Sequence, residues 1–351
     1  MPKTGSYSGR KYPDLERIQI RIDASGSTIT EFTKESNESY INRLHRMTPY
    51  DESTNKATFD LVHVTRDKAG DPPNIAPEVY MCLSQNQDWI DHFILDILHN
   101  KNYGFHHVPE EASTNQVHTF LITSVLYTLF WTYHAPTATT KGMLVSRSCN
   151  MVGRSTAIYA GFTALLRSYQ DHIHNPSLLV FISSAHLISV IDRCLVKARD
   201  IIRLIESRSG HGGWHNQEPD IRSTSKKVTL EANWDNTMAC SKRAAECTTT
   251  LANLERQVEL ADGLNLFMIK DSDGCFGKDN SWGQNIKDSL KLATKVLQSR
   301  VIHAKPNVSY LQERARTQSA VVSSRTHVKE LMSLTWTASC PPHPRRLHYQ
   351  H

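Results

Sequence analysis

The stretch His211-Gly212-Gly213-Trp214-His215 places two histidines four residues apart, on either side of two glycines. A glycine-rich loop of this type can stabilise an oxyanion during acyl transfer, but no Gly-x-Ser-x-Gly nucleophile motif accompanies it. Two histidines at this spacing can bind a metal from one face of a helix, but paired glycines disfavour a helix. Glycine usually follows the end of a helix, so we favour a helix C-cap followed by polar loop residues.

Three aspartates, Asp271, Asp273 and Asp279, lie in the segment 271–284, which has the composition of a loop. A calcium-binding loop that starts at Asp271 requires glycine at its sixth position and glutamate at its twelfth. These positions hold Phe276 and Trp282. The calcium pattern therefore fails, and a solvated turn between two helices is predicted.

Two further pairs have helical spacing. His186 and Asp192 are six residues apart and would point to different faces, so we expect polar groups of the core or of an interface. Cys240 and Cys247 are seven apart on one helical face, and we expect buried thiols. The chain has seven cysteines and no Cys-x-x-Cys, which favours reduced thiols in a cytosolic protein.

No nucleotide-binding, metalloprotease or serine-hydrolase motif is present in the sequence. Gly277-Lys278 lacks the preceding glycine and the following Ser or Thr of a P-loop. We therefore predict no catalytic or cofactor-binding residues and no enzyme activity, and we assign no metal ligands.

The net charge of +5 arises at one end of the chain. Residues 301–351 hold seven Lys/Arg and two Asp/Glu, whereas residues 1–300 hold 33 of each sign. A neutral body without a basic stripe argues against nucleic acid as the main partner.

Two apolar runs, 120–133 and 178–191, are each 14 residues long. A membrane-spanning helix needs about 20 mostly apolar residues. The first run is rich in β-branched and aromatic residues and predicts a buried strand. The second predicts a buried helix, so no membrane span is expected. The N-terminus has no apolar core of a secretory signal.

Periodicity predicts the elements around these runs. Apolar residues recur every three or four positions from Leu178 to Ile205, which predicts one continuous helix. A second helix is predicted over 228–270 and a third from 285, which Pro306 should kink or restart. The remaining predictions are strands at 17–22, 57–64, 124–134 and 141–147, helices at 88–98 and 154–170, and a loop or short strand at 101–108.

These elements predict an α+β fold, with an N-terminal mixed α/β domain followed by long helices that form a stalk or bundle. We expect four segments: a polar N-terminal region with short strands (1–75), an α/β domain (76–176), a long-helix bundle or stalk (177–322), and an irregular, disordered basic tail (323–351).

Several segments resemble a fungal group of CorA-like magnesium-transporter proteins. Together they lie between about 120 and 322 and follow the family's order of a strand hairpin, a first long helix with a break after it, a next helix and a stalk helix. They are LFWTYHAPTATTKGMLVSR (129–147), HLISVIDRCL (186–195), IRLIESRSGHGGWHN (202–216), LANLERQVELADGLNLFMI (251–269) and YLQERARTQSAVV (310–322).

The resemblance implies a cytosolic domain that assembles as a homo-oligomer through its long helices. It also implies that acidic residues between subunits sense a divalent cation, with Mg²⁺ as the cofactor. Which acidic residues would do so in this chain is left unassigned.

The family continues into two transmembrane helices with a Gly-Met-Asn type signature, which this sequence lacks, and residues 323–351 contain no apolar run. A chain without an apolar span cannot form a pore, so we expect a pore-less domain that does not conduct ions by itself. An altered reading frame, a retained intron or a truncated gene copy would explain the tail. We expect a cytoplasmic location for the chain as written, and a membrane location for any full-length form with transmembrane helices.

Three alternatives remain open: a helical interaction or scaffold protein without a metal role, an incomplete gene model of a membrane transporter, and a hydrolase that uses the His211 loop.

Overall fold

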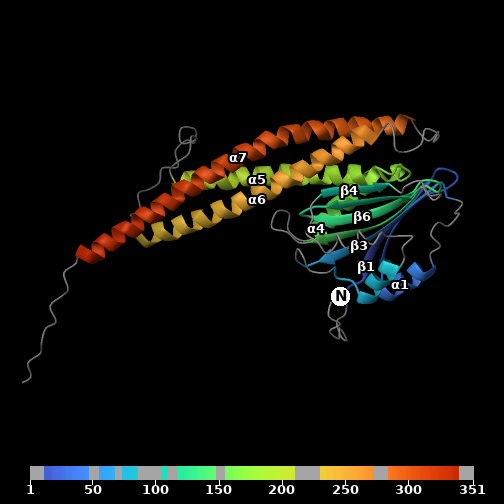
Figure 1. The fold of residues 1–351 in the computed structure, drawn as a ribbon, viewed down its shortest axis with the longest axis horizontal. Coiled ribbons are helices and arrows are strands. Elements are labelled where there is room, and N and C mark those ends of the chain that lie inside the picture. Colours follow the sequence, from blue (N-terminus) through green and yellow to red (C-terminus); the bar gives the residue numbers. More distant parts are fainter. Residues whose placement is uncertain are drawn as a thin grey trace, which may run out of the picture. The chain divides into compact units, whose positions relative to one another are not determined.

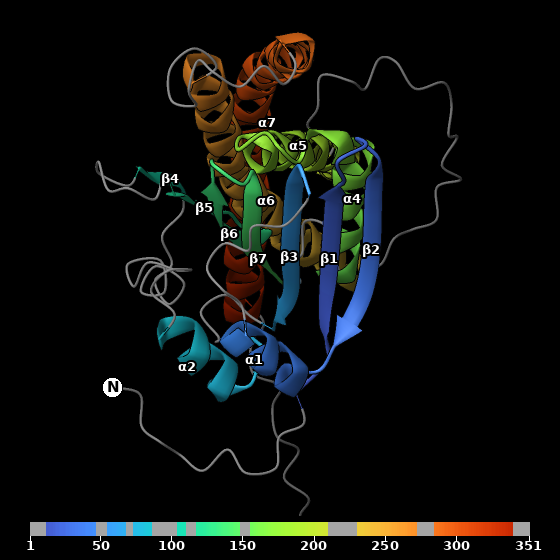
Figure 2. The same ribbon diagram turned by 90° about the vertical axis from the view of Figure 1, so that its right-hand side faces the viewer.

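The computed structural model describes residues 12–46, 55–67, 73–85, 104–109, 117–147, 155–209, 230–271 and 284–339. Its strands form one seven-stranded sheet in the order β2-β1-β3-β7-β6-β5-β4 (Figure 2). Strands β3 and β7 pair in parallel, and every other neighbouring pair is antiparallel. The strands are β1 Leu15–Ile22, β2 Thr28–Glu35, β3 Ala57–Arg66, β4 Gly104–Pro109, β5 Val117–Thr123, β6 Tyr127–His134 and β7 Thr139–Arg147.

The strands predicted at 17–22 and 57–64 are confirmed as β1 and β3. In β1 the side chains of Ile18, Ile20 and Ile22 are buried, and the residues between them face the other side of the sheet. The turn into β2 is held by the Asp23 carboxylate, which accepts the backbone N–H of Ser27 at 2.9 Å. A strand with one fully apolar face is thereby fixed in register.

The apolar run 120–133 is buried, as predicted, but it forms two strands rather than one. The hydroxyl of Ser124 accepts the backbone N–H groups of Leu126 and Tyr127 at 3.1 Å, and this turn separates β5 from β6. The Arg147 guanidinium donates to the carbonyls of Ser124 and Val125 in the same turn. The predicted hairpin of 124–134 with 141–147 is confirmed as β6 and β7.

The segments before and after residue 75 contribute to the same sheet. Strands β1 to β3 come from the segment before it and β4 to β7 from the segment after it, yet all seven form one sheet. The reason is the parallel pairing of β3 with β7, which aligns residues about 80 positions apart, such as Leu61 with Gly142. Such long-range pairing has no local signature in the sequence.

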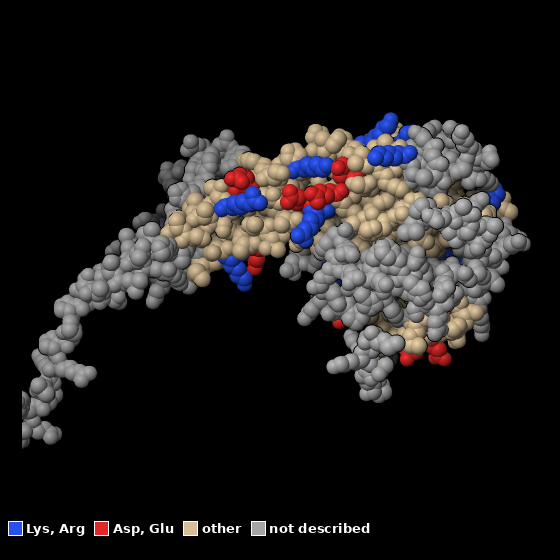
Figure 3. Space-filling view, in the orientation of Figure 1, with Lys and Arg blue, Asp and Glu red and all other residues tan. Residues whose placement is uncertain are grey.

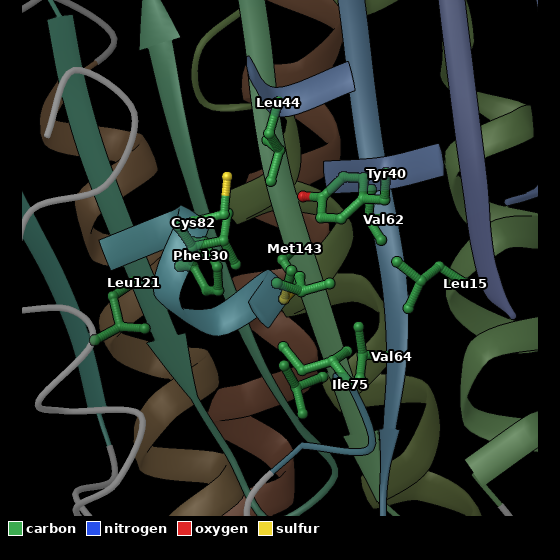
Figure 4. Close-up of a cluster of buried hydrophobic side chains, with 13 residues drawn as sticks. Leu15, Tyr40, Leu44, Val62, Val64, Ile75, Cys82, Leu121, Phe130 and Met143 are labelled. Atoms are coloured by element: carbon green, nitrogen blue, oxygen red, sulfur yellow. The ribbon is translucent and has the colours of Figure 1, made fainter. Parts of the chain in front are cut away.

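Two short helices cover part of one sheet face. Helix α1 spans Asn37–Arg46, and helix α2 spans Pro77–Gln85. Ser36 caps α1 by accepting the N–H of Ser39 at 3.1 Å. Tyr40 and Leu44 of α1 and Cys82 of α2 pack with sheet residues in one apolar cluster (Figure 4). The labelled sheet and loop members of that cluster are Leu15, Val62, Val64, Ile75, Leu121, Phe130 and Met143.

The opposite sheet face packs against helix α4 (Ser155–Ser168), which confirms the predicted helix at 154–170, and against α5 (Leu178–Ser209). Tyr127 of β6 contacts Phe162 of α4 edge-on and stacks against His186 of α5. A short 3₁₀ turn, η1 (Gln170–His172), follows α4 and bonds to Thr28 and Thr30 of β2.

Three long helices follow in the order predicted (Figure 1): α5, α6 (Leu230–Asp271) and α7 (Gln284–Ser339). Within the residues described, α5 is the one helix long and apolar enough to span a membrane by length and composition. Of its most apolar 18-residue window, 72% is buried within the fold, as the predicted buried helix requires.

Helix α7 corrects the prediction of an irregular segment from residue 323. It continues through Pro306 without restarting and ends at Ser339. Residues 323–339 contain neither glycine nor proline, and the proline cluster begins only at Pro341. A run without helix breakers continues an existing helix even when its apolar period is lost, because propagation is cheaper than nucleation. Residues 340–351 and the predicted helix at 88–98 lie outside the described residues.

The chain divides into two compact units, Met1–Cys194 with Arg256–Lys305 and Leu195–Glu255 with Pro306–His351. The first unit contains the sheet, so the boundary predicted at 176/177 does not separate the sheet from the helices. In the second unit, Arg314 of α7 pairs with the largely buried Glu206 of α5, and Ser209 donates to Gln318 at 3.0 Å. The predicted fold class, a mixed α/β sheet domain followed by long helices, is confirmed.

His186 gives a measurable test of core packing. Its side chain is 2% exposed, and neither ring nitrogen has a hydrogen-bond partner among the described residues. Burial, with a smaller effect of the Arg193 charge, lowers the pKa of His186 to about 4. The folded state then binds fewer protons than the unfolded state between about pH 4 and 6.5, so stability falls as the pH falls through that window.

We predict that the wild type loses about 2 kcal/mol more than His186→Leu when the pH is lowered from about 7 to 5. Urea unfolding at both pH values measures the difference, with His303→Gln as the exposed control. An equal pH response in all three proteins would contradict the assignment.

Candidate functional site

The structure describes only some of the residues singled out by motif. His211, His215, Asp273 and Asp279 lie outside the described residues, and Asp271 is the last residue of α6. His186 and Asp192 lie on different faces of α5, as predicted. The first is buried, and the second pairs with Arg300 of α7.

Cys240 and Cys247 are buried free thiols, as expected. Burial raises the pKa of Cys247 to about 11. Cys82 and Cys194 are also buried, and neither forms a disulfide. A thiol with a raised pKa is protonated at neutral pH and is a poor nucleophile.

A polar cup of about 820 Å³ lies on the sheet face beside α1. It occupies the part of that face where polar residues of β1, β3 and β7 replace the apolar cluster. Its polar lining includes Arg17, Gln19, Arg21, Glu35, Glu38, Ser39, Asn42, Thr58, Asp60, Thr139 and Lys141.

A charge network forms one wall of the cup. Asp60 of β3 accepts two hydrogen bonds from Arg17, at 2.8 and 2.9 Å, and a third from Arg43 of α1 at 2.8 Å. Arg43 also donates to Glu35 at 3.0 Å. Burial lowers the pKa of Arg17, but the hydrogen bond and charge of Asp60 outweigh it, and the net shift is upward.

The network limits the chemistry of the cup. Bidentate guanidinium contacts already use the carboxylate oxygens of Asp60 and Glu35, which a hard cation would require. The cup is therefore a polar surface with balanced charges that anchors α1 to the sheet, and it does not fit a Mg²⁺ site.

On the opposite sheet face, three side chains form a hydrogen-bonded chain across β1, β3 and β7. The Ser146 hydroxyl lies 2.7 Å from Nε2 of His63, and Nδ1 of His63 lies 2.9 Å from the Glu16 carboxylate. The His63 ring stacks on Tyr159 of α4, with centroids 3.9 Å apart. These are the distances of a serine, histidine and carboxylate hydrolase triad.

The direction of one hydrogen bond follows from its partners. The hydrogen bond from His63 lowers the pKa of Glu16, although burial opposes it, so Glu16 is an acceptor at neutral pH. His63 Nδ1–H then donates to Glu16, and in the tautomer protonated at Nδ1 alone, Nε2 accepts the Ser146 O–H.

The exposure of the three residues is opposite to what a hydrolase needs. Ser146 is 0% exposed and His63 is 4% exposed, whereas the Glu16 side chain is 39% exposed. A nucleophile must reach its substrate, and Ser146 is the most deeply buried of the three. This chain of residues ties three strands and α4 together, and it does not form an active site.

Sequence reasoning missed both groups because the contacts between strands that assemble them join residues 43 to 83 positions apart: Arg17 with Asp60, Glu16 with His63, and His63 with Ser146. A weak signal was present: a histidine in the apolar strand 57–64 must find a buried partner. No group of three or more His, Cys, Asp or Glu side chains that could hold a metal occurs in the part of the chain that the structure describes.

No protein-family model matches the chain, and no curated protein matches its sequence. Three solved structures are similar. Full-length CmaX is 12% identical in sequence with a TM-score of 0.48, and the match covers 94% of this chain and 83% of the CmaX chain. The CorA magnesium transporter of Methanocaldococcus jannaschii is 9% identical with a TM-score of 0.49, and the match covers 92% of this chain and 81% of the transporter chain. The ZntB cytoplasmic domain of Vibrio parahaemolyticus RIMD 2210633 is 11% identical with a TM-score of 0.43, and the match covers 90% of this chain and 99% of the ZntB domain. Values this low do not establish a family for the chain.

We predict that Ser146→Ala destabilises the protein by about 1–3 kcal/mol, because it leaves Nε2 of the buried His63 without its partner. We also expect a fluorophosphonate probe to leave the folded wild type unmodified. Urea unfolding and intact-protein mass spectrometry measure the two effects. Labelling of Ser146 that disappears in His63→Gln would contradict the structural role and indicate a nucleophile.

Proposed function

We propose that this chain is a CorA-like domain, corresponding to the cytosolic region of a divalent-cation transporter that handles magnesium. The supporting observation is where the segments that resemble the family lie in the fold. They fall on elements of the type and order that the resemblance implies: 129–147 on the β6–β7 hairpin, 186–195 and 202–209 on α5, 251–269 on α6, and 310–322 on α7.

The chain acts on the cytosolic side in this proposal and does not conduct ions by itself. The packing of α5 supports this view. Its apolar window contributes Leu179, Phe181 and Ile182 to the interior, where all three are at most 2% exposed. A helix whose apolar surface is needed within the protein is not available to face lipid.

Cation sensing would use carboxylates contributed by more than one copy of the chain. Within one copy, several of the described carboxylates are paired with basic groups. Asp262, for example, accepts hydrogen bonds from Lys305 and from Gln298, the latter at 2.7 Å. Burial raises the pKa of Asp262, but these two hydrogen bonds outweigh it and keep the net shift downward. Mg²⁺ needs several oxygen ligands in octahedral geometry, so acidic groups of neighbouring copies would have to meet.

A stripe on α7 supports self-association. Leu292, Val296, Ser299 and His303 are spaced four, three and four residues apart, all four are exposed, and none is Asp, Glu, Lys or Arg. Leu292 is 66% exposed and Val296 is 57% exposed. On the long helices, Lys/Arg and Asp/Glu lie near one another (Figure 3). Side chains with this spacing typically form the contact seam between two packed helices.

The first test is thermal unfolding of the full chain with and without millimolar MgCl₂. A tenfold excess of Mg²⁺ over its dissociation constant should stabilise the protein by about 1.4 kcal/mol and raise the melting temperature by roughly 2 °C. NaCl at equal ionic strength is the control, because it screens charge without binding. A shift no larger than in NaCl would contradict cation sensing and favour a helical scaffold.

The second test concerns the α7 stripe. We predict that the wild type self-associates at micromolar concentration, and that Leu292→Glu with Val296→Glu weakens the association at least tenfold by placing charges in the seam. Sedimentation velocity measures both proteins. Ile302→Glu is the matched control, since Ile302 is 56% exposed on the same helix but lies off the stripe. A monomeric wild type, or an equal effect of the control, would contradict the interface.

A further inference from the structure

Two histidines meet at the β4 end of the sheet. His107 lies on β4 and His118 on β5, and the register pairs His107 with Phe120 and Pro109 with His118. The two histidines are therefore diagonal neighbours on one face. Nε2 of His107 lies 3.4 Å from Nδ1 of His118, so the two nitrogens share one proton in a weak hydrogen bond.

Aromatic packing fixes the position of this pair. The His107 ring stacks on Phe120 with centroids 4.5 Å apart and planes 9° apart, and Phe120 stacks in turn on Trp131 at 4.8 Å. Phe267 of α6 contacts the His107 ring edge-on at 5.5 Å. These contacts place the His107 imidazole between a strand and a helix.

The nitrogen separation matches the spacing of two ligands on one metal ion. Zinc binds imidazole nitrogen at about 2.0–2.1 Å in tetrahedral geometry, which places two ligand nitrogens about 3.3–3.4 Å apart. Both side chains are half-buried, so water can reach the site and complete the coordination. We propose that His107 and His118 bind a borderline divalent transition-metal ion such as Zn²⁺, with water as the other ligands.

The chemistry separates this site from the proposed response to magnesium. Neutral imidazole suits Zn²⁺, Ni²⁺ and Cu²⁺, whereas Mg²⁺ prefers oxygen ligands. The metal would take the place of the shared proton, which passes to the solvent, and each ring would turn so that its lone pair points at the metal. The site needs one copy of the chain only and does not rest on the proposed function.

Titration of the full chain with ZnCl₂ by isothermal calorimetry at neutral pH tests the proposal. His107→Phe removes one ligand but keeps a ring to stack on Phe120, and His118→Asn removes the other. We expect each substitution to abolish one equivalent of bound Zn²⁺ or to weaken it at least tenfold. Circular dichroism checks that the variants fold.

His106→Asn is the matched control, because His106 is exposed on the same strand and alternation points it to the other face. It should bind Zn²⁺ like the wild type, and MgCl₂ should give no heat that depends on either histidine of the pair. Other histidines and thiols can add equivalents that persist in every variant. The same number of equivalents and the same affinity in the wild type, His107→Phe and His118→Asn would overturn the proposal.

Discussion

The parallel pairing of β3 with β7 is the contact on which the sheet domain depends. It is the one parallel pair in an otherwise antiparallel sheet, and it joins the three N-terminal strands to the β4–β7 meander. Two polar groups lie along it, one on each face. The polar residues of β7 line the cup beside Asp60 of β3, and the His63–Ser146 hydrogen bond crosses between the same two strands on the other face. Without this pairing, the cup would lose its β7 residues and His63 would lose Ser146.

The two faces satisfy their polar groups in different ways. On the α1 face, Arg17, Asp60 and Arg43 keep their charges and neutralise one another at the edge of an open cup, where water still solvates them in part. On the α4 face, the groups become less charged with depth, from the Glu16 carboxylate through the imidazole to a fully buried hydroxyl. The desolvation penalty explains this order, because an ion costs far more to bury than a hydroxyl.

Local pattern predicted many of the elements, but it missed β2, α1 and α2 and did not predict which strands pair. The three-to-four spacing from Leu178 to Ile205 predicted α5, and the alternation in 17–22 predicted β1. The pairing of β3 with β7 across residue 75 was not foreseen, because parallel pairing leaves no local mark. The predicted end of the third long helix, before residue 323, was wrong. Helix α7 continues to Ser339, beyond the last residue of the apolar repeat, because the added segment has no helix breaker. The pairing of His63 with Ser146 spans 83 residues, and that of His107 with His118 spans a strand connection, so no fixed motif spacing could reveal either.

The charge balance of the chain bears directly on how it could respond to a cation. The even count of acidic and basic residues in 1–300 is realised in part by specific pairs, including Arg17–Asp60, Arg43–Glu35 and Arg300–Asp192. A carboxylate held by a guanidinium gives up a charge-assisted hydrogen bond when it turns to a metal, so such pairs disfavour a cation site inside one copy. Sites built from carboxylates of two copies avoid this cost. Association brings these negative charges together, and a bound cation offsets the repulsion between them. An acid-based response would therefore depend on protein concentration as well as on the cation, whereas a pair of neutral imidazoles on one sheet would respond to the metal alone.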